Sequence, residues 1–230
     1  DRKLYIADGH HRYETALNYR NYCRENGISK PGDPQDFQMI YLVDMEHPGL
    51  VVFPTHRLVR DLPNFDKEAV LEKCSEFFYI DEKEGTDTME EDLKKLYDEG
   101  KKAFGFYCGK GEWFLLTLKN IDIMSQMLPN VSKASQSLDV SVLHTLILEK
   151  IFGIDKENMA KQINLTYTKF FTEAIDGVNK GEFQCSFVLN PTRVTEIRDV
   201  AAAGEKMPQK STYFYPKMIT GMVMNNLGVD

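Results

Sequence analysis

The sequence predicts a mixed α+β fold of largely antiparallel sheets with packed helices. Short apolar runs of strand length alternate with longer segments that carry helix caps and stops. Two of these runs, residues 102–108 and 112–118, are joined by Gly109-Lys110-Gly111, a connection typical of an antiparallel hairpin. The 230-residue chain is 42% apolar, which is enough for the core of one large or two small domains.

In the first part of the chain, a strand is expected at residues 4–7 and a helix at residues 10–25. Asp8 would cap this helix and Gly27 would end it. The remaining elements before the hairpin are expected as strands or helices from the same signals: strands at residues 37–43, 50–53 and 77–81, and helices at residues 66–77 and 86–98.

After the hairpin, a long helix is expected from Ser137, its cap, to Gly153, its stop. Helix or strand patterns predict the following elements: helices at residues 155–162, 169–179 and 191–203, and strands at residues 163–167, 183–190 and 218–224. We expect residues 1–62 to form one portion, and residues 63–230 an α+β region that is either separate from the first or integrated with it.

Net charge, cysteine spacing and the length of apolar runs limit the classes of protein to which this chain can belong. The net charge of −7 disfavours a general nucleic-acid binder, which is normally basic. The four cysteines show no C-x-x-C spacing and indicate reduced thiols. No apolar run approaches the ~20 residues that span a bilayer, so a soluble cytoplasmic protein is expected. The chain enters a predicted strand almost at once after Asp1, which suggests that an N-terminal portion precedes it.

The stretch Asp8-Gly9-His10-His11-Arg12 is the first candidate site. A strand that turns through glycine into a helix directs free backbone amides to one point at the positive end of the helix dipole, where phosphate or carboxylate binds. Arg12 would add a planar fork of donors, and the histidines further donors. The negative charge of Asp8 is compatible with a phosphate if Mg²⁺ lies between them, or if Asp8 accepts the proton of an attacking hydroxyl.

Two alternatives remain open for this stretch. Asp8 could simply cap the helix, with both histidines on its surface. Zinc is less favoured, because adjacent histidines on a helix point about 100° apart and a third ligand would have to come from His56.

Two further segments offer phosphate contacts. Thr55, His56 and Arg57 follow a predicted strand, and they would converge with Arg12 if the two strand ends lie side by side. Lys210 lies in a proline-flanked, extended segment that could equally be an edge strand. His144, within an aliphatic helix, is interpreted as a core or boundary histidine.

Four strings carry a resemblance to a known family: "YIADGHHRYETAL", "FPTHRLV", "LDVSVLHTLILEKIFGI" and "GEKMPQKSTYFYPK". Together they resemble the DUF1015 proteins, whose function is uncharacterised. Gly9, Arg12 and Ala16 are also similar to the G-x-x-R-x-x-x-A pattern of the ParB/sulfiredoxin superfamily. That resemblance implies a segment that opens a helix and holds nucleotide phosphates.

The superfamily includes ParB-like free serine kinases, whose Asp-Gly-His element contains a catalytic aspartate. Asp8 is the residue that matches it. The resemblance implies a nucleotide-dependent phosphotransferase, possessing kinase-like activity on a small hydroxyl substrate, with ATP or ADP, or CTP as in ParB, and Mg²⁺ held by Asp8. Asp8 and His10 would be catalytic, and the phosphates would contact the following residues: Gly9, His10, His11, Arg12, Thr55, His56, Arg57 and Lys210.

Two other functions stay open. One is a ParB-like regulatory protein that binds a nucleotide without turnover, and the other is an interaction domain. Nucleic acid is disfavoured as a partner because residues 137–182 carry more acidic than basic side chains.

Overall fold

The computed structural model describes residues 4–217, 221, 224, 226 and 227. The chain forms two compact units. Unit 1 combines Asp1–Val51 with Phe214–Asp230, and unit 2 is Val52–Tyr213. The expected division into domains after residue 62 stays a prediction.

Unit 2 is built on a six-stranded sheet in the order β3-β5-β4-β7-β2-β6. Each of the five neighbouring pairs is antiparallel. The strands are, in chain order, β2 (His56–Val59), β3 (Phe78–Glu84), β4 (Ala103–Tyr107), β5 (Glu112–Leu118), β6 (Leu165–Thr168) and β7 (Cys185–Val188). The α+β class and the β4–β5 hairpin are therefore confirmed.

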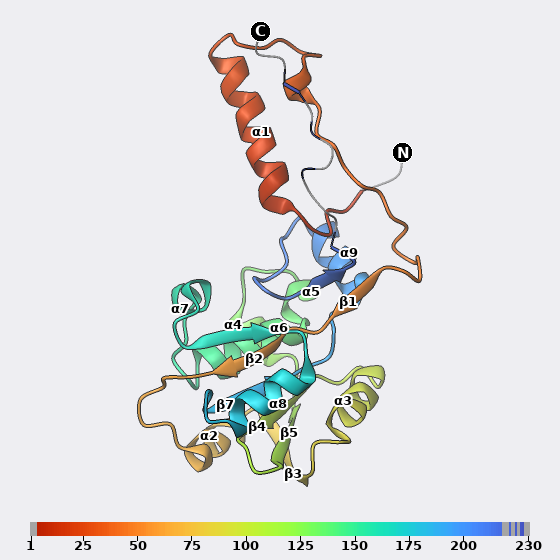
Figure 1. The fold of residues 1–230 in the computed structure, drawn as a ribbon. Coiled ribbons are helices and arrows are strands. Elements are labelled where there is room, and N and C mark those ends of the chain that lie inside the picture. The colour runs from red at the N-terminus through yellow and green to blue at the C-terminus, as the bar shows by residue number, and fades with distance from the viewer. Residues whose placement is uncertain (1–3, 218–220, 222–223, 225, 228–230) are drawn as a thin grey trace. The chain divides into compact units, whose positions relative to one another are not determined.

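Helices cover both faces of this sheet, because alternate residues of each strand point to opposite sides. On one face, Phe104 and Leu116 share a core cluster with residues of α2 (Lys67–Cys74), α4 (Ile123–Met127) and α7 (Lys156–Lys161). On the other face, Trp113 and Val188 pack with α3 (Met89–Asp98) and α8 (Phe171–Asn179). Figure 1 shows α8 lying across the strands of this second face.

The expected helix over residues 137–153 forms, but in two parts. Leu138, not Ser137, is the N-cap of α6 (Asp139–Val142), and the chain continues as a π-helix, η2 (Leu143–Glu149). Beside it, α5 (Lys133–Gln136) contacts α9 (Val194–Ala202). π-Helical turns are rare and frequently lie at functional sites.

Most of the other expected elements are also confirmed within a few residues. These are α2, α3, α7, β6, α8, β7 and α9. The short helices α4 and α5 are not indicated by the sequence signals used above. All four cysteines are free thiols, three of them buried and Cys108 partly buried. None of the helices in the described part of the chain is long and apolar enough to cross a membrane.

Unit 1 contains α1 (His10–Glu25), which confirms the expected helix, and a short 3₁₀ turn, η1 (Pro34–Asp36). After α1 the chain returns alongside the helix (Figure 1), held there by Arg24, whose Nη2 lies 2.6 Å from a carboxylate oxygen of Asp36. The strands expected at residues 4–7 and 37–43 are wrong. Their apolar side chains are largely exposed, and neither segment forms a ladder with a described partner strand, which an extended backbone needs.

The strands β1 (Val51–Phe53) and β8 (Tyr213–Tyr215) form a two-stranded sheet. Both points at which the chain passes from one unit to the other fall within these strands. β1 confirms the strand expected at residues 50–53, and β8 confirms the edge-strand interpretation of the segment after Lys210. The strand expected at residues 218–224 falls mostly outside the described residues.

Candidate functional site

The Asp8–Arg12 corner opens α1 in unit 1. Gly9 is the N-cap residue, in the left-handed conformation with φ 83°, which glycine adopts without steric cost. No side chain of the described residues caps the helix, so the expected capping role of Asp8 is wrong. The first helical amides have no partner inside the helix, and they lie at the positive end of its dipole.

Asp8 instead lies between two cations. One of its carboxylate oxygens is 3.2 Å from Nζ of Lys217 and 3.9 Å from Nη2 of Arg12. All three side chains are 41–57% exposed. Ion pairs at such exposure contribute little to stability, so these cations can exchange partners at low cost. Because they neutralise Asp8, its charge does not prevent an anion from approaching the corner.

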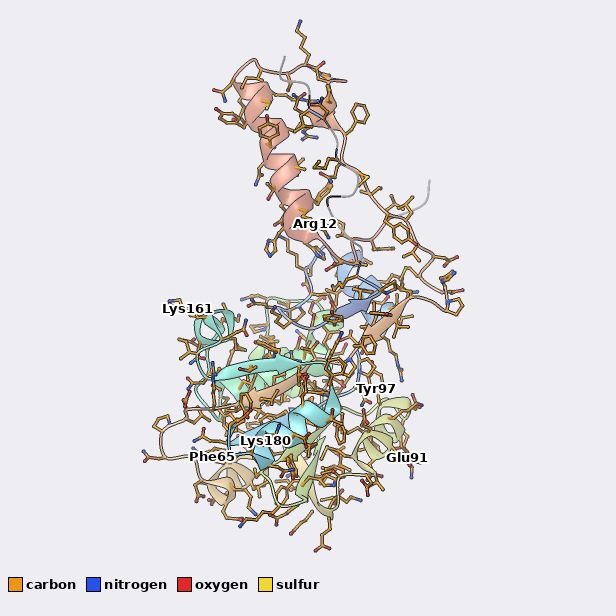
Figure 2. The ribbon with its side chains drawn as sticks, in the orientation of Figure 1. Arg12, Phe65, Glu91, Tyr97, Lys161 and Lys180 are labelled. Carbon is orange, nitrogen blue, oxygen red and sulfur yellow. The ribbon has the colours of Figure 1, made fainter. Side chains whose placement is uncertain are left out.

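Arg12 folds back over the turn that precedes the helix. A Cβ atom placed on Gly9 would lie 2.9 Å from Nη2 of Arg12, so any residue larger than glycine would displace the guanidinium. Figure 2 labels Arg12 on the first turn of α1. A hollow of about 520 Å³ begins at this side chain and follows the helix. It is lined by His11, Arg12, Thr15, Ala16, Tyr19, Gln38 and Leu227.

The two histidines of this corner differ in their surroundings. His10 is half-buried. His11 is fully exposed, and its Nδ1 lies 3.9 Å from Glu14. Among the described residues, no three His, Cys, Asp or Glu side chains come together as a metal site.

Thr55, His56 and Arg57 lie in unit 2 and follow β1 as expected, but the expectation that all three are loop residues is wrong. His56 and Arg57 are themselves the first residues of β2, the second strand from the edge of the sheet. Both side chains are buried, Arg57 completely. Their convergence with Arg12 stays a prediction, because Arg12 belongs to the other unit.

Arg57 donates hydrogen bonds to three groups, one two residues away and two from distant parts of unit 2. Its Nη1 donates to the carbonyl of Thr55, and its Nη2 lies 3.1 Å from the carbonyl of Lys210 and 3.0 Å from Nε2 of His144. Its guanidinium also lies 5.4 Å from the ring centre of Tyr167. Lys210 thus contacts the site through its backbone, whereas the sequence suggested its ammonium group.

Burial sets the charge states in this cluster. It lowers the pKa of Arg57 to about 10, which still leaves the guanidinium charged at neutral pH. The pKa of His56 is lowered to about 4, mainly by burial and to a smaller extent by the charge of Arg57. The same two causes hold the pKa of His144 well below its usual range. Both imidazoles are therefore neutral at pH 7.

His144 and Tyr167 were not among the expected site residues. His144 has the core position expected of it, but it also bonds Arg57. Tyr167 lies directly opposite Arg57 in the β2–β6 register. His56-Arg57-Leu58-Val59 shows no alternation of polar and apolar residues that could have indicated a strand here, and all four residues are buried. The contacts of Arg57 with the histidine and the tyrosine join segments far apart in the sequence.

Comparisons with known proteins give one family. A family model described as "Protein of unknown function (DUF1015)" matches residues 1–141. No curated protein matches the chain.

Solved structures similar to this chain include a conserved hypothetical protein from Pyrococcus furiosus, at 19% identity and TM-score 0.46. They also include a free serine kinase in complex with AMP, at 16% identity and TM-score 0.47. The alignments cover 91% of this chain, and 68% and 66% of those two chains respectively.

Proposed function

Because the chain belongs to the DUF1015 family, whose function is unknown, we propose a biochemical role from its own geometry: a nucleotide-dependent phosphotransferase acting on a small hydroxyl substrate. The observation that supports this role is the uncapped N-terminus of α1, where Arg12 and Lys217 stand beside Asp8. Backbone amides, a guanidinium and an ammonium at one point form the donor set that holds phosphates in phosphoryl-transfer sites.

The binding part of the proposal assigns the phosphates to the amides of His10 and His11 and to the guanidinium of Arg12. Gly9 lets the phosphates approach the backbone, since it has no side chain. The nucleoside would lie in the hollow along α1, whose volume of about 520 Å³ is within the ordinary range for small-molecule sites. ATP, ADP and CTP all satisfy this arrangement.

The catalytic part of the proposal assigns proton transfer to Asp8. Its carboxylate would accept the proton of the substrate hydroxyl, while His10 helps to orient the transferred group. Mg²⁺ is usually held by one or two carboxylates together with phosphate oxygens and water. Asp8 would supply one carboxylate, so the corner fits this ion. When bound, Mg²⁺ would neutralise charge on the phosphates.

Calorimetric titration of the chain with ATP, ADP and CTP, with and without Mg²⁺, tests binding. Arg12→Ala should weaken nucleotide affinity about tenfold or more, because a charged hydrogen bond contributes ~1.5–3 kcal/mol. Arg20→Ala, on the same helix and bonded to Asn21, is the matched control and should bind like the wild type. Equal affinity for the Arg12 and Arg20 variants would exclude the proposed phosphate site.

Turnover is tested separately, by following nucleotide consumption by ³¹P NMR with a panel of small hydroxylated metabolites. Asp8→Asn should keep nucleotide affinity and abolish turnover. Turnover that survives this substitution would remove the catalytic role of Asp8. Binding without any turnover by the wild type would favour a regulatory nucleotide-binding protein instead.

A further inference from the structure

The buried Arg57 of unit 2 has no carboxylate partner among the described residues. Its hydrogen bonds go to two carbonyl groups and one neutral imidazole, and its Nε has no partner there. A fully buried charge without a counter-ion costs several kcal/mol. Buried charges in proteins are normally paired with an opposite charge, and a bound anion could supply that partner here.

A cavity of about 480 Å³ within unit 2 is lined by two of the side chains that contact this arginine, although Arg57 itself does not line it. Two of its lining residues, His144 and Tyr167, are the same side chains that contact the Arg57 guanidinium. The π-helix η2 supplies His144, and β6 supplies Tyr167. The cavity therefore connects to the buried charge through these two side chains.

Both side chains present hydrogen-bond donors. A guanidinium only donates, so Nε2 of His144 must accept the bond from Arg57. A neutral imidazole then carries its proton on Nδ1, which has no bond to a described residue. The hydroxyl of Tyr167 is buried and likewise lacks a partner among the described residues. These two unused donors belong to the two side chains that contact one buried cation, and such a pair of donors is complementary to a carboxylate.

The rest of the cavity limits the ligand. Much of its lining is apolar, including Leu128, Val131 and Met159. Lys156 and Lys206 add cations, but Glu149 and Glu205 also line the cavity and would repel a dianion such as a phosphate ester. One negative charge on an apolar body suits this combination best.

We propose that this cavity binds a small monocarboxylic acid, with its carboxylate on His144 and Tyr167 in front of Arg57 and its apolar body against Leu128, Val131 and Met159. The inference concerns unit 2 alone, so it stands or falls independently of the nucleotide site proposed in unit 1.

Ligand-observed NMR and calorimetry with hexanoate test the proposal, and 1-hexanol serves as a neutral ligand of matched size. Hexanoate should bind the wild-type chain about tenfold or more tightly than hexanol, since the difference is a charged hydrogen bond. Arg57→Met should abolish this preference. Lys161→Ala, at the exposed end of α7 (Figure 2), is the control and should retain it.

Tyr167→Phe provides a milder variant, because it removes one unpaired hydroxyl and keeps the ring beside the guanidinium. Thermal unfolding should match the wild type, and hexanoate affinity should fall severalfold with hexanol affinity unchanged. The proposal is overturned if hexanoate does not bind, if hexanol binds equally well, or if both variants keep the wild-type preference for the acid.

Discussion

His56 is expected to make the protein sensitive to acid, and His56→Asn isolates this effect. The side chain is 1% exposed. Its Nδ1 accepts a bond from the amide of Leu189 at 3.4 Å, and its Nε2 has no partner among the described residues. Asparagine retains an acceptor near Nδ1 and does not titrate, so the substitution removes the proton-binding group with little change in hydrogen bonding.

The magnitude follows from the pKa of His56, which burial lowers from 6.5 to about 4. Between these values the unfolded chain binds a proton that the folded chain does not, so stability decreases as the pH falls. A shift of this size corresponds to about 3 kcal/mol in the free energy of unfolding, at ~1.4 kcal/mol per pKa unit. This contribution is complete above pH 6.5 and mostly lost at pH 4.

Asp139 acts in the opposite direction, so the wild-type profile alone is not diagnostic. Burial raises the pKa of Asp139 to about 6, although Nζ of Lys102 lies 3.0 Å from its carboxylate. In the range from pH 4 to 6 the folded chain therefore holds this proton more tightly, and acid stabilises it. The comparison between wild type and variant cancels this term.

Urea unfolding at pH 7 and pH 4, followed by circular dichroism, measures the difference. The stability of the wild type relative to His56→Asn should fall by about 3 kcal/mol between the two pH values. His47→Asn, at an exposed position, is the matched control for the loss of one histidine. A relative stability that stays constant with pH would refute the assignment of His56 as a buried neutral group.

Two further substitutions test the packing and the helix ends. Gly177→Ala should destabilise the chain by ~1–3 kcal/mol in thermal unfolding, because its Cβ would lie 2.8 Å from the Phe183 ring and 3.2 Å from Leu58. Unchanged stability would show that these neighbours can move. Asp66→Ala should cost about 1 kcal/mol in urea unfolding, since its carboxylate accepts the amide of Ala69 at the start of α2, whereas Asp66→Asn should retain most of that stability.

Elements with local determinants could be predicted from the sequence. The β4–β5 hairpin is one, since Gly109, Lys110 and Gly111 all adopt positive φ in its turn. The segment at residues 37–43 shows the limit of such reasoning. Its apolar run is typical of a strand, but a strand also requires a partner, and the run alone does not supply one.

In the candidate sites too, contacts between residues close in sequence could be predicted, and contacts between distant segments could not. Gly9 and Arg12 are close in sequence, so their contact could be anticipated from the turn into α1. The position of Lys217 beside Asp8 could not, because it depends on contacts between distant segments. Arg57 was expected at a strand exit because it follows the apolar run of residues 50–53, and loop residues after a strand often face a site. Its burial arises from pairing with β6 and β7, which lie far along the chain.

The discontinuous make-up of unit 1 has a consequence for biosynthesis. Asp8 meets Lys217, and the Gln35 side chain donates to the carbonyl of Leu227, so neither contact exists until the end of the chain has left the ribosome. At ~5–20 residues per second, α1 waits on the order of ten seconds or more while all of Val52–Tyr213 is translated. The contacts that complete unit 1 therefore form only after the whole of unit 2 has been synthesised.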